Sequence, residues 1–272
     1  MTKPKLSISI MFPFLNDWGT VGSLVALAVD TVGKLTDDWE VVIVNDGSKL
    51  EDRFALGMIV DLINSKFKSQ NSKSSPQMRD PAEAGQLKIK NSKVSSRIKI
   101  IDHEENRGYG GALRSGFAAA SKDLIFYTDC DAQYDPRELR FLYEKLKQGV
   151  GMVNGFKIKR NDPWFRIIAG RVYHHLAAIA FGLPIRDTDC DFRLIRREVF
   201  QKIKLFENTG TICVELVKKI DHAGYKIAQV PVHHFWRTSG KSQFFNFKRV
   251  GKTGINLFRL WWKLMVKKDY IR

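Results

Sequence analysis

The sequence predicts an α/β protein with a mostly parallel β-sheet and helices on both faces. Short apolar runs alternate with segments of helical spacing, and several of those runs end in polar or acidic clusters. A hydrophobic content of 44% over 272 residues is enough for a substantial core. Alternating strands and helices are typical of parallel sheets, whose ligands bind beyond the carboxyl ends of the strands. We therefore look for a functional site at those ends.

The first part of the predicted sheet comes from three apolar runs. The predicted strands are 6–12, 39–44 and 97–102, and the predicted helices between them are 20–32 and 51–63. The segments after the first two strands, 12–17 and 45–48, are predicted loops because they are rich in turn-forming residues.

Residues 65–97 have the composition of an insertion. They are rich in Ser, Lys, Asn and Gln, contain Pro76 and Pro81, and hold few large apolar groups. Such a segment cannot bury enough apolar surface to fold by itself, so we predict a surface segment without fixed structure. The rest of residues 1–243 is predicted to form one domain.

The same alternation continues in the second part of the chain. The predicted strands are 124–127, 151–156 and 225–230, and the predicted helices are 112–121, 137–147, 164–182 and 211–223. A glycine-rich turn, 106–112, opens the first of these helices. Glycines allow close backbone approach, and a helix N-terminus favours phosphate, but a plain tight turn explains this piece equally well.

An acidic cluster follows the buried strand 124–127. Asp129 and Asp131 lie one residue apart, the amide of Gln133 comes two residues later, and Pro136 opens a helix. Carboxylate and amide oxygens are the ligands that hard divalent cations such as Mg²⁺ or Mn²⁺ prefer. The cluster predicts a metal site, although a solvated acidic turn would have the same composition.

The net charge of +16 lies at two places in the chain. Residues 65–100 hold nine Lys and Arg against two acids, and residues 237–272 hold ten against one, so these windows account for the whole excess. Basic segments of this kind attract nucleic acid or an anionic membrane face. Because the chain shows no recognised nucleic-acid-binding module, we expect no nucleic-acid partner.

The composition also indicates the cellular compartment in which the protein is expected. The longest uncharged apolar run, 176–183, is much shorter than the roughly 18 residues of a membrane span. The N-terminus lacks the apolar stretch of a signal peptide. Three cysteines without metal-ligand spacing favour a reducing, cytoplasmic compartment.

The C-terminal segment 244–272 is predicted to be a basic amphipathic helix with a short tail. One polar stripe runs along it, consisting of Lys252, Asn256, Arg259, Lys263 and Lys267. Apolar residues, including Trp261 and Trp262, fill the remaining surface. A basic stripe beside a Trp-rich apolar sector is typical of a helix at a membrane interface. The competing interpretation is a helix packed on the domain with its basic face in water.

Six short motifs follow one another along the chain. They are Pro-Phe-Leu-Asn-Asp (13–17), Asn-Asp-Gly-Ser (45–48), Asn-Arg-Gly-Tyr-Gly-Gly-Ala (106–112), Asp-Cys-Asp-Ala-Gln-Tyr-Asp-Pro (129–136), Asp-Phe-Arg (191–193) and Arg-Thr-Ser-Gly-Lys-Ser (237–242). Together they resemble the family 2 glycosyltransferases, and most closely the polyprenyl-phosphate sugar transferases such as dolichol-phosphate mannose synthase. The order and spacing of the motifs carry the resemblance, because each motif alone is weak.

The resemblance implies a Rossmann-like GT-A fold and an inverting, metal-dependent transfer of a sugar. The donor would be a UDP- or GDP-sugar, the cofactor Mg²⁺ or Mn²⁺, and the acceptor a lipid phosphate at the cytoplasmic face of a membrane, where the protein would be peripheral. The implied metal ligands are Asp129, Asp131 and Gln133, and the implied catalytic residues are Asp131, Asp191 and Arg237. The implied donor-binding residues are Pro13, Phe14, Asn16, Asp46, Arg107, Gly108 and Asp129. The implied ligands of the acceptor phosphate are Lys157, Arg171, Arg237 and Ser242.

The chain departs from the family pattern at three positions. Asn45 replaces the first aspartate of D-D-G-S, Asp17 replaces the usual glutamate, and Asp191 stands where glycine is common. An alternative function, which shares the donor half and differs only at the acceptor, is a family 2 transferase that acts on a glycan or protein hydroxyl. That reaction needs a general base, for which the candidates are Asp189, Asp191 and Glu215. Salt bridges to neighbouring basic residues are the structural alternative for these carboxylates.

Overall fold

A computed structural model describes residues 6–71, 97–159, 161, 164–237 and 247–270. Its centre is a seven-stranded sheet in the order β3-β2-β1-β4-β6-β5-β7. The strands are β1 (Ile8–Phe14), β2 (Trp39–Asp46), β3 (Ile98–His103), β4 (Leu124–Thr128), β5 (Val150–Lys157), β6 (Phe192–Arg196) and β7 (Lys226–Val232). The predicted α/β class is confirmed.

The sheet is mostly parallel, as predicted. Strands β1, β2, β3 and β4 pair in parallel, and so do β5 and β7. Strand β6 is the exception, because it runs antiparallel to both β4 and β5. The start of β6 therefore lies beside the end of β4, which brings two distant polar segments to one edge of the sheet.

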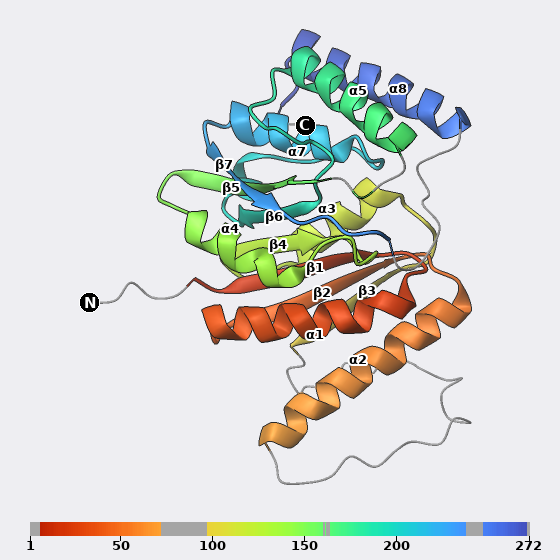
Figure 1. The fold of residues 1–272 in the computed structure, drawn as a ribbon, viewed down its shortest axis with the longest axis vertical. Coiled ribbons are helices and arrows are strands. Elements are labelled where there is room, and N and C mark those ends of the chain that lie inside the picture. The colour runs from red at the N-terminus through yellow and green to blue at the C-terminus, as the bar shows by residue number, and fades with distance from the viewer. Residues whose placement is uncertain (1–5, 72–96, 160, 162–163, 238–246, 271–272) are drawn as a thin grey trace.

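Helices cover both faces of the sheet (Figure 1). The larger helices are α1 (Trp18–Leu35), α2 (Leu50–Asn71), α3 (Tyr109–Ala119), α4 (Leu139–Lys145), α5 (Trp164–Phe181), α7 (Ile212–His222) and α8 (Phe247–Trp261). Three short elements complete the fold, namely η2 (Pro136–Glu138), α6 (Val199–Lys202) and the π-helical turn η3 (Trp262–Val266). Apolar residues of α1, α2 and α4 form one core, and those of α3, α5, α7 and α8 form the other.

The strand sequences explain why the sheet has two apolar faces. Every residue of β1 and β2 is buried. Along β1, Ile8, Ile10 and Phe12 contribute to the core under α1, whereas Met11 faces the core under α3. Continuous apolar runs are expected for strands that are covered on both sides.

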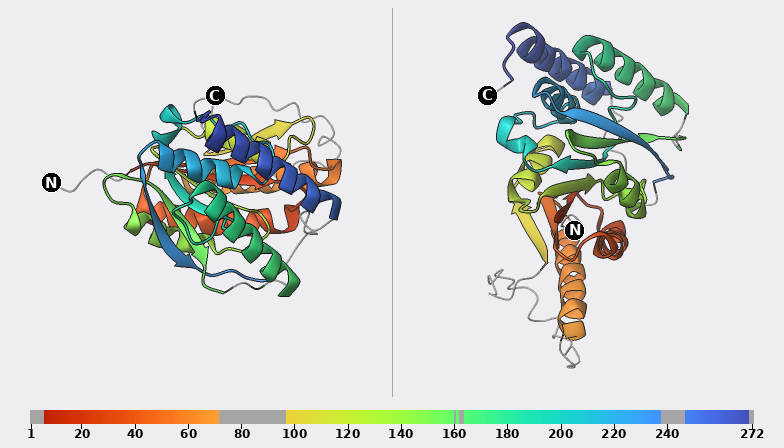
Figure 2. Two further views of the ribbon diagram at one scale, coloured as in Figure 1. Left: turned by 90° about the horizontal axis from the view of Figure 1, so that it is seen from above. Right: turned by 90° about the vertical axis from the view of Figure 1, so that its left-hand side faces the viewer.

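Most boundaries differ from the predicted ones by a few residues, and two of the differences affect predicted loops. Strand β1 continues to Phe14, so the first three residues of the predicted loop 12–17 belong to the strand. Helix α2 continues to Asn71, so the predicted unstructured segment 65–97 begins as helix, and Figure 2 shows α2 projecting away from the sheet. The remainder of that prediction, 72–96, lies outside the described residues.

Helices α5 and α8 lie side by side at the end of the molecule away from α1 and α2 (Figures 1 and 2). The indole Nε1 of Trp261 donates a hydrogen bond of 3.0 Å to the carbonyl oxygen of Ala180, and Leu260 and Leu264 are fully buried. Trp261 thus joins α8 to α5, whereas its neighbour Trp262 is 47% exposed. Within the described residues, no helix combines the length and apolar character that a membrane span needs.

Candidate active site

The carboxyl ends of β1, β2 and β4 meet at one edge of the sheet. Phe14 pairs with Asn45 at the ends of β1 and β2, and Met11 of β1 pairs with Tyr127 near the end of β4. Asp46 is the last residue of β2, and Asp129 follows β4 directly. The predicted donor and metal residues from three separate motifs therefore lie at the same edge.

Asp129 is a partly buried carboxylate that accepts a hydrogen bond from a tyrosine. Its Oδ1 accepts a hydrogen bond of 2.8 Å from the hydroxyl of Tyr109, the first residue of α3. Burial raises the pKa of Asp129 well above its usual value, and the nearby carboxylates of Asp191 and Asp131 raise it further. Raised carboxyl pKa values without a neutralising partner are expected where a site is built to receive a cation.

Asp131 is paired with Arg237. The guanidinium NH2 of Arg237 lies 2.6 Å from Asp131 Oδ2, and the backbone N–H of Gln133 donates to Asp131 Oδ1 at 3.0 Å. Burial raises the pKa of Asp131, although Arg237 lowers it. Arg237, predicted to bind the acceptor phosphate, thus touches a predicted metal ligand. The same charges act on Asp17. Burial raises the pKa of Asp17 to about 6, while the positive charge of Arg237 lowers it and the negative charge of Asp131 raises it.

The side chain of Gln133 points to the backbone of the segment that carries Arg237. Gln133 Nε2 donates to the carbonyl oxygen of Phe235 at 3.2 Å, and the Phe235 N–H donates to the Gln133 carbonyl oxygen at 2.8 Å. These two contacts hold the 233–237 segment against the acidic loop. A metal-ligating role for the Gln133 amide oxygen stays a prediction.

Asp191 joins the acidic cluster from the start of β6. Its Oδ1 accepts hydrogen bonds from the Cys213 thiol at 3.0 Å and the Tyr127 hydroxyl at 3.3 Å. The sequence did not single out Tyr127 or Cys213, because their contact with Asp191 depends on the antiparallel placement of β6. Asp191 contributes to the raised pKa of Asp129, so the two carboxylates interact.

Arg193 is the fully buried anchor of this region. Its guanidinium donates to Asn154 Oδ1 (2.7 Å), the Tyr127 hydroxyl (2.8 Å) and the Thr188 carbonyl oxygen (2.7 Å). The Asp191 carboxylate lies 3.9 Å from the same group. These contacts tie β4, β5 and β6 together beneath Asp191.

The predicted nucleoside end is formed by β1, β2 and the turns that follow them. Asn16, which has a positive φ of 58°, receives Lys49 N–H on its Oδ1 at 3.0 Å, and its own N–H donates to Ser48 Oγ. Asp46 is 3% exposed. The ring of Phe14 packs in the core, with 1% of the residue exposed, and Pro13 is also buried, so neither presents a broad surface to a base.

The glycine-rich turn faces another loop of the chain. The Gly110 N–H donates to the carbonyl oxygen of Asn208 at 3.0 Å. A Cβ on Gly108, whose φ is +84°, would lie 2.3 Å from that oxygen, and one on Gly110 would lie 2.4 Å from the Glu207 oxygen. The close approach that the glycines permit is therefore to residues 207–208, and this contact explains why they are glycines. Phosphate is not needed to account for them.

A basic hollow of about 480 Å³ lies between β5 and α5. It brings together Lys157 and Arg171, two of the predicted acceptor ligands. Cationic or ionisable residues that were not predicted also line it, namely Lys159, His174, His175 and Arg186. Arg171, His174 and His175 share one helix face at a spacing of three and four, a signal that was available in the sequence.

The ammonium group of Lys157 already has two partners within this hollow. Its Nζ donates to the Asp189 carbonyl oxygen at 2.7 Å and lies 3.4 Å from Asp187 Oδ2. Lys159, Arg171 and Arg186 supply the remaining fixed positive charge. Ser242, the last predicted acceptor ligand, lies outside the described residues.

Other candidate residues have structural partners. Glu215 is fully buried, forms a 3.0 Å ion pair with Lys219, and accepts hydrogen bonds from the N–H groups of Phe206 and Glu207. These contacts leave Glu215 no role as a general base at the sheet edge. His233 contacts Glu138 through its ring and backbone. All three cysteines are buried and free.

A family model described as "Glycosyl transferase family 2" matches residues 80–204. The glycosyltransferase AglD of Haloferax volcanii is 24% identical and matches 100% of this chain. An undecaprenyl-phosphate 4-deoxy-4-formamido-L-arabinose transferase of Enterobacter sp. is 25% identical over 87% of the chain. The chain spans only 39% of the first relative and 62% of the second.

Solved structures with the same fold include glucosyl-3-phosphoglycerate synthase of Mycobacterium tuberculosis. Its complex with Mn²⁺, UDP and glucosyl-3-phosphoglycerate matches with a TM-score of 0.61 and 16% identity, over 95% of this chain and 79% of that one. Its complex with Mg²⁺ and UDP matches with a TM-score of 0.60 and 17% identity, over 95% of this chain and 79% of that one. Because the sequence identity is only 16–17%, the structural similarity establishes the fold alone.

Proposed function

We propose, from the premise that this chain is a family 2 glycosyltransferase with the GT-A fold, that it transfers a sugar with inversion from a nucleotide-sugar to a polyprenyl phosphate. One observation carries the proposal: an acidic cluster at the end of β4 and a basic hollow at the end of β5 belong to the same sheet. The first suits a cation with a diphosphate, and the second suits a phosphate acceptor. Two curated relatives are named as undecaprenyl-phosphate transferases, which supports the same acceptor class.

The acidic cluster has the chemistry of a Mg²⁺ or Mn²⁺ site. Asp131 supplies a buried carboxylate and Asp129 a partly buried one, and Arg237 forms an ion pair with Asp131. Among the described residues no group of three or more His, Cys, Asp or Glu could enclose a metal. A pair of carboxylates fits all the same, because Mg²⁺ commonly binds one or two carboxylates together with substrate phosphates and water. The bound ion would neutralise the charge that develops on the leaving diphosphate.

The chain's own residues then orient the two substrates. Asp46 and the turn at Asn16 stand at the nucleoside end, and Lys159, Arg171 and Arg186 stand where an acceptor phosphate is attracted. With a second pKa of about 6, a phosphate monoester is already largely dianionic at neutral pH, so it needs positioning more than a general base. For a hydroxyl acceptor, Asp191 is the carboxylate placed to serve as the base.

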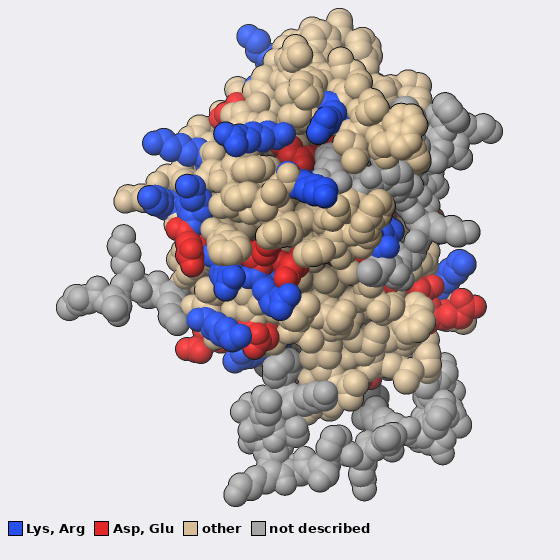
Figure 3. Space-filling model, in the orientation of Figure 1, with Lys and Arg blue, Asp and Glu red and all other residues tan. Residues whose placement is uncertain are grey.

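Helices α5 and α8 support a membrane location for the acceptor. On α5 the exposed apolar residues include Phe165, Ile168, Val172, Leu176 and Ile179, and on α8 and η3 they include Ile255, Phe258, Trp262 and Val266. Each set repeats at three and four residues, so each forms one stripe along its helix. Figure 3 shows this end of the molecule as a largely uncharged surface with Lys and Arg side chains beside it.

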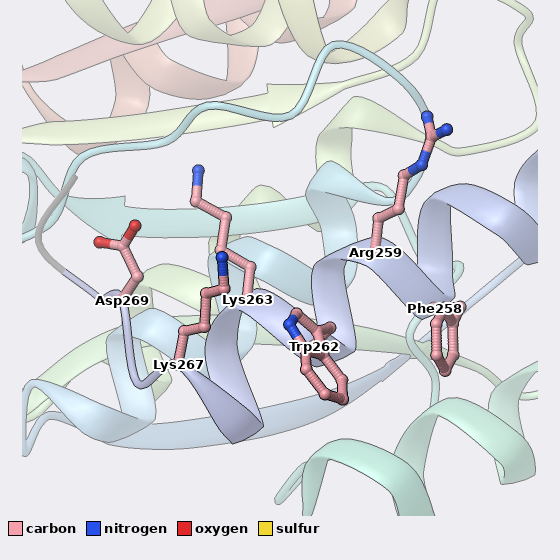
Figure 4. A pocket seen from close by; sticks show the side chains of 6 residues that line it. All are labelled: Phe258, Arg259, Trp262, Lys263, Lys267 and Asp269. Atoms are coloured by element: carbon pink, nitrogen blue, oxygen red, sulfur yellow. The ribbon is translucent and has the colours of Figure 1, made fainter.

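Basic residues accompany the apolar stripe of α8. A cavity of about 540 Å³ is lined by Phe258, Trp262, Arg259, Lys263 and Lys267, with Asp269 as its acidic member. In Figure 4 the three cationic side chains extend to one side of the helix and the two aromatic rings to the other. Apolar rings beside cations are suited to the headgroup region of an anionic bilayer, so we propose peripheral binding at the cytoplasmic face.

Sugar transfer is tested with a panel of UDP- and GDP-sugars, each with Mn²⁺ and one of two acceptors. We expect release of nucleoside diphosphate and a labelled lipid product with polyprenyl phosphate, and no product with free sugar hydroxyls. Product with a hydroxyl acceptor alone would establish the alternative function. Binding of RNA without any turnover of the donors would contradict both.

Membrane binding is tested by flotation with liposomes that contain anionic phospholipid. The Phe258→Ala/Trp262→Ala variant should float at least about tenfold less than the wild type, because it loses two exposed aromatic anchors. Trp261 is unsuitable for this test, since it is bonded to α5. The matched control is Met58→Ala/Leu62→Ala on α2, where two exposed apolar residues lie far from α8. Equal flotation of the two double variants would reject the α8 interface.

A further inference from the structure

The structure places a buried histidine directly behind Asp46. His103 is the last residue of β3, pairs with Asp46 of β2 in the sheet, and is only 2% exposed. Its Nδ1 lies 2.7 Å from Asp46 Oδ1, and its Nε2 lies 2.8 Å from the hydroxyl of Ser115 on α3. Because the carboxylate can only accept, Nδ1 carries the proton, and in the neutral ring Nε2 then accepts from Ser115.

The two carboxylate oxygens of Asp46 differ in their hydrogen bonds. Oδ1 accepts from His103 and from the backbone N–H of Arg107 at 2.8 Å. Oδ2 accepts no hydrogen bond within the described part of the chain, and it is not among the buried polar atoms that lack a partner. Two donors therefore fix one oxygen, while the other is not fully buried and belongs to the last residue of β2, at the strand ends where ligands of such sheets bind.

We propose that His103 is a positioning residue that holds the Asp46 carboxylate in the orientation that binds the nucleoside of the donor. The inference rests on the proposed function, since it needs a nucleotide at this edge. It assigns to His103 no contact with the substrate. The ring acts through Asp46, and Ser115 fixes the tautomer and plane of the ring.

The geometry distinguishes two replacements of His103. Asparagine places an amide nitrogen near the position of Nδ1, so His103→Asn can still donate to Asp46. Glutamine places its amide near the position of Nε2, so His103→Gln reaches toward Ser115 and loses the contact with Asp46. Hydrogen bonds to a charged group are strong enough that loss of this one should weaken nucleotide binding about tenfold.

The experiment is calorimetric titration of UDP and of GDP, each with Mn²⁺, into the wild type and the variants. We expect His103→Gln to raise the dissociation constant about tenfold and His103→Asn to stay within about threefold of the wild type. In an Asp46→Ala background, His103→Gln should have no further effect, because a residue that acts through Asp46 loses its target. His222→Ala, which removes a ring stacked on Tyr270, is the matched control and should bind normally.

The outcomes separate this inference from the proposed function. If the wild type binds neither nucleotide, the proposed function fails and the inference fails with it. If the wild type binds and Asp46→Ala binds more weakly, yet His103→Gln binds like the wild type, only the role of His103 is overturned. Equal weakening by Gln and Asn, or an unchanged effect of Gln in the Asp46→Ala background, would show that His103 serves the fold alone. Thermal melting of each variant identifies any that fail to fold.

Discussion

At the scale of single residues, Glu40 is the clearest case of a charge that the fold requires. Its carboxylate accepts from Ser9 Oγ at 2.8 Å and from Lys99 Nζ at 2.7 Å. The backbone N–H and hydroxyl of Ser121 also donate to it, at 2.7 and 2.9 Å. Burial alone would raise the pKa of Glu40, but these partners outweigh it and lower the pKa to about 2. The residue joins β1, β2, β3 and the turn before β4.

We predict that Glu40→Gln lowers the free energy of unfolding by about 2 kcal/mol at pH 7, as expected for lost hydrogen bonds to a charge. The folded-state pKa lies below the ordinary value of 4.5, so the charged form is favoured by folding. Its contribution is complete above pH 4.5 and is lost as the pH falls toward about 2. Urea unfolding should show the difference from wild type shrinking over that window.

Asp30→Asn is the control for Glu40, because its pair with Lys34 is exposed and should contribute at most about 1 kcal/mol. A Glu40→Gln deficit that stays constant from pH 7 to pH 2.5 would contradict the assignment of the charge.

A single residue also shows what the sequence could not reveal. The sequence identifies Asn45 as a departure from the family pattern but offers no reason for it. In the structure Asn45 Nδ2 donates to Asp102 Oδ1 on β3 at 2.7 Å, and Asn45 Oδ1 accepts from the Ser48 N–H. An aspartate at position 45 would meet Asp102 as a second carboxylate. The reason for the departure lies 57 residues away and is visible only once β2 and β3 are paired.

At the scale of elements, β6 depends on Arg193. Removing its guanidinium would leave Asn154 Oδ1, the Tyr127 hydroxyl and the Thr188 carbonyl oxygen without a donor in a buried site. We predict that Arg193→Leu destabilises the protein by about 3–5 kcal/mol, measured by chemical unfolding. Arg197→Leu, which loses one exposed hydrogen bond to Lys122, should cost less than about 1 kcal/mol. Similar losses for the two variants would contradict the role of Arg193.

Most elements were predictable because periodicity and turn residues act locally. The strands at β2 and β4 and the helices at α5 and α7 lie close to their predicted ranges. The antiparallel direction of β6 was not predictable, since an apolar run carries no sign of its direction. The partner of the glycine-rich turn was also missed, because Gly108 and Gly110 need small size for a contact with residues 207–208 that only the folded chain makes.

At the scale of the whole molecule, three surfaces adjoin in a way that the proposed reaction requires. The acidic cluster follows β4, the basic hollow is lined by residues of β5 and α5, and the apolar stripes lie on α5 and α8, which are side by side in Figure 1. The sequence predicted the acidic cluster, and the family resemblance implied Lys157 and Arg171 as acceptor ligands, which the structure brings together in the basic hollow. It did not predict the contact of Arg237 with Asp131, which are 106 residues apart, because that pairing depends on how the 233–237 segment packs on the acidic loop.

The central claim is that Asp129 and Asp131 bind a divalent cation together with the donor diphosphate. The most direct measurement is titration of Mn²⁺ in the presence of UDP, followed by the electron paramagnetic resonance signal of free Mn²⁺. We predict that Asp129→Asn and Asp131→Asn each weaken Mn²⁺ binding by more than about tenfold. Asp135→Asn, whose carboxylate is held by Arg137, should bind Mn²⁺ as the wild type does. Binding of Mn²⁺ with UDP by both cluster variants at wild-type affinity would contradict the account.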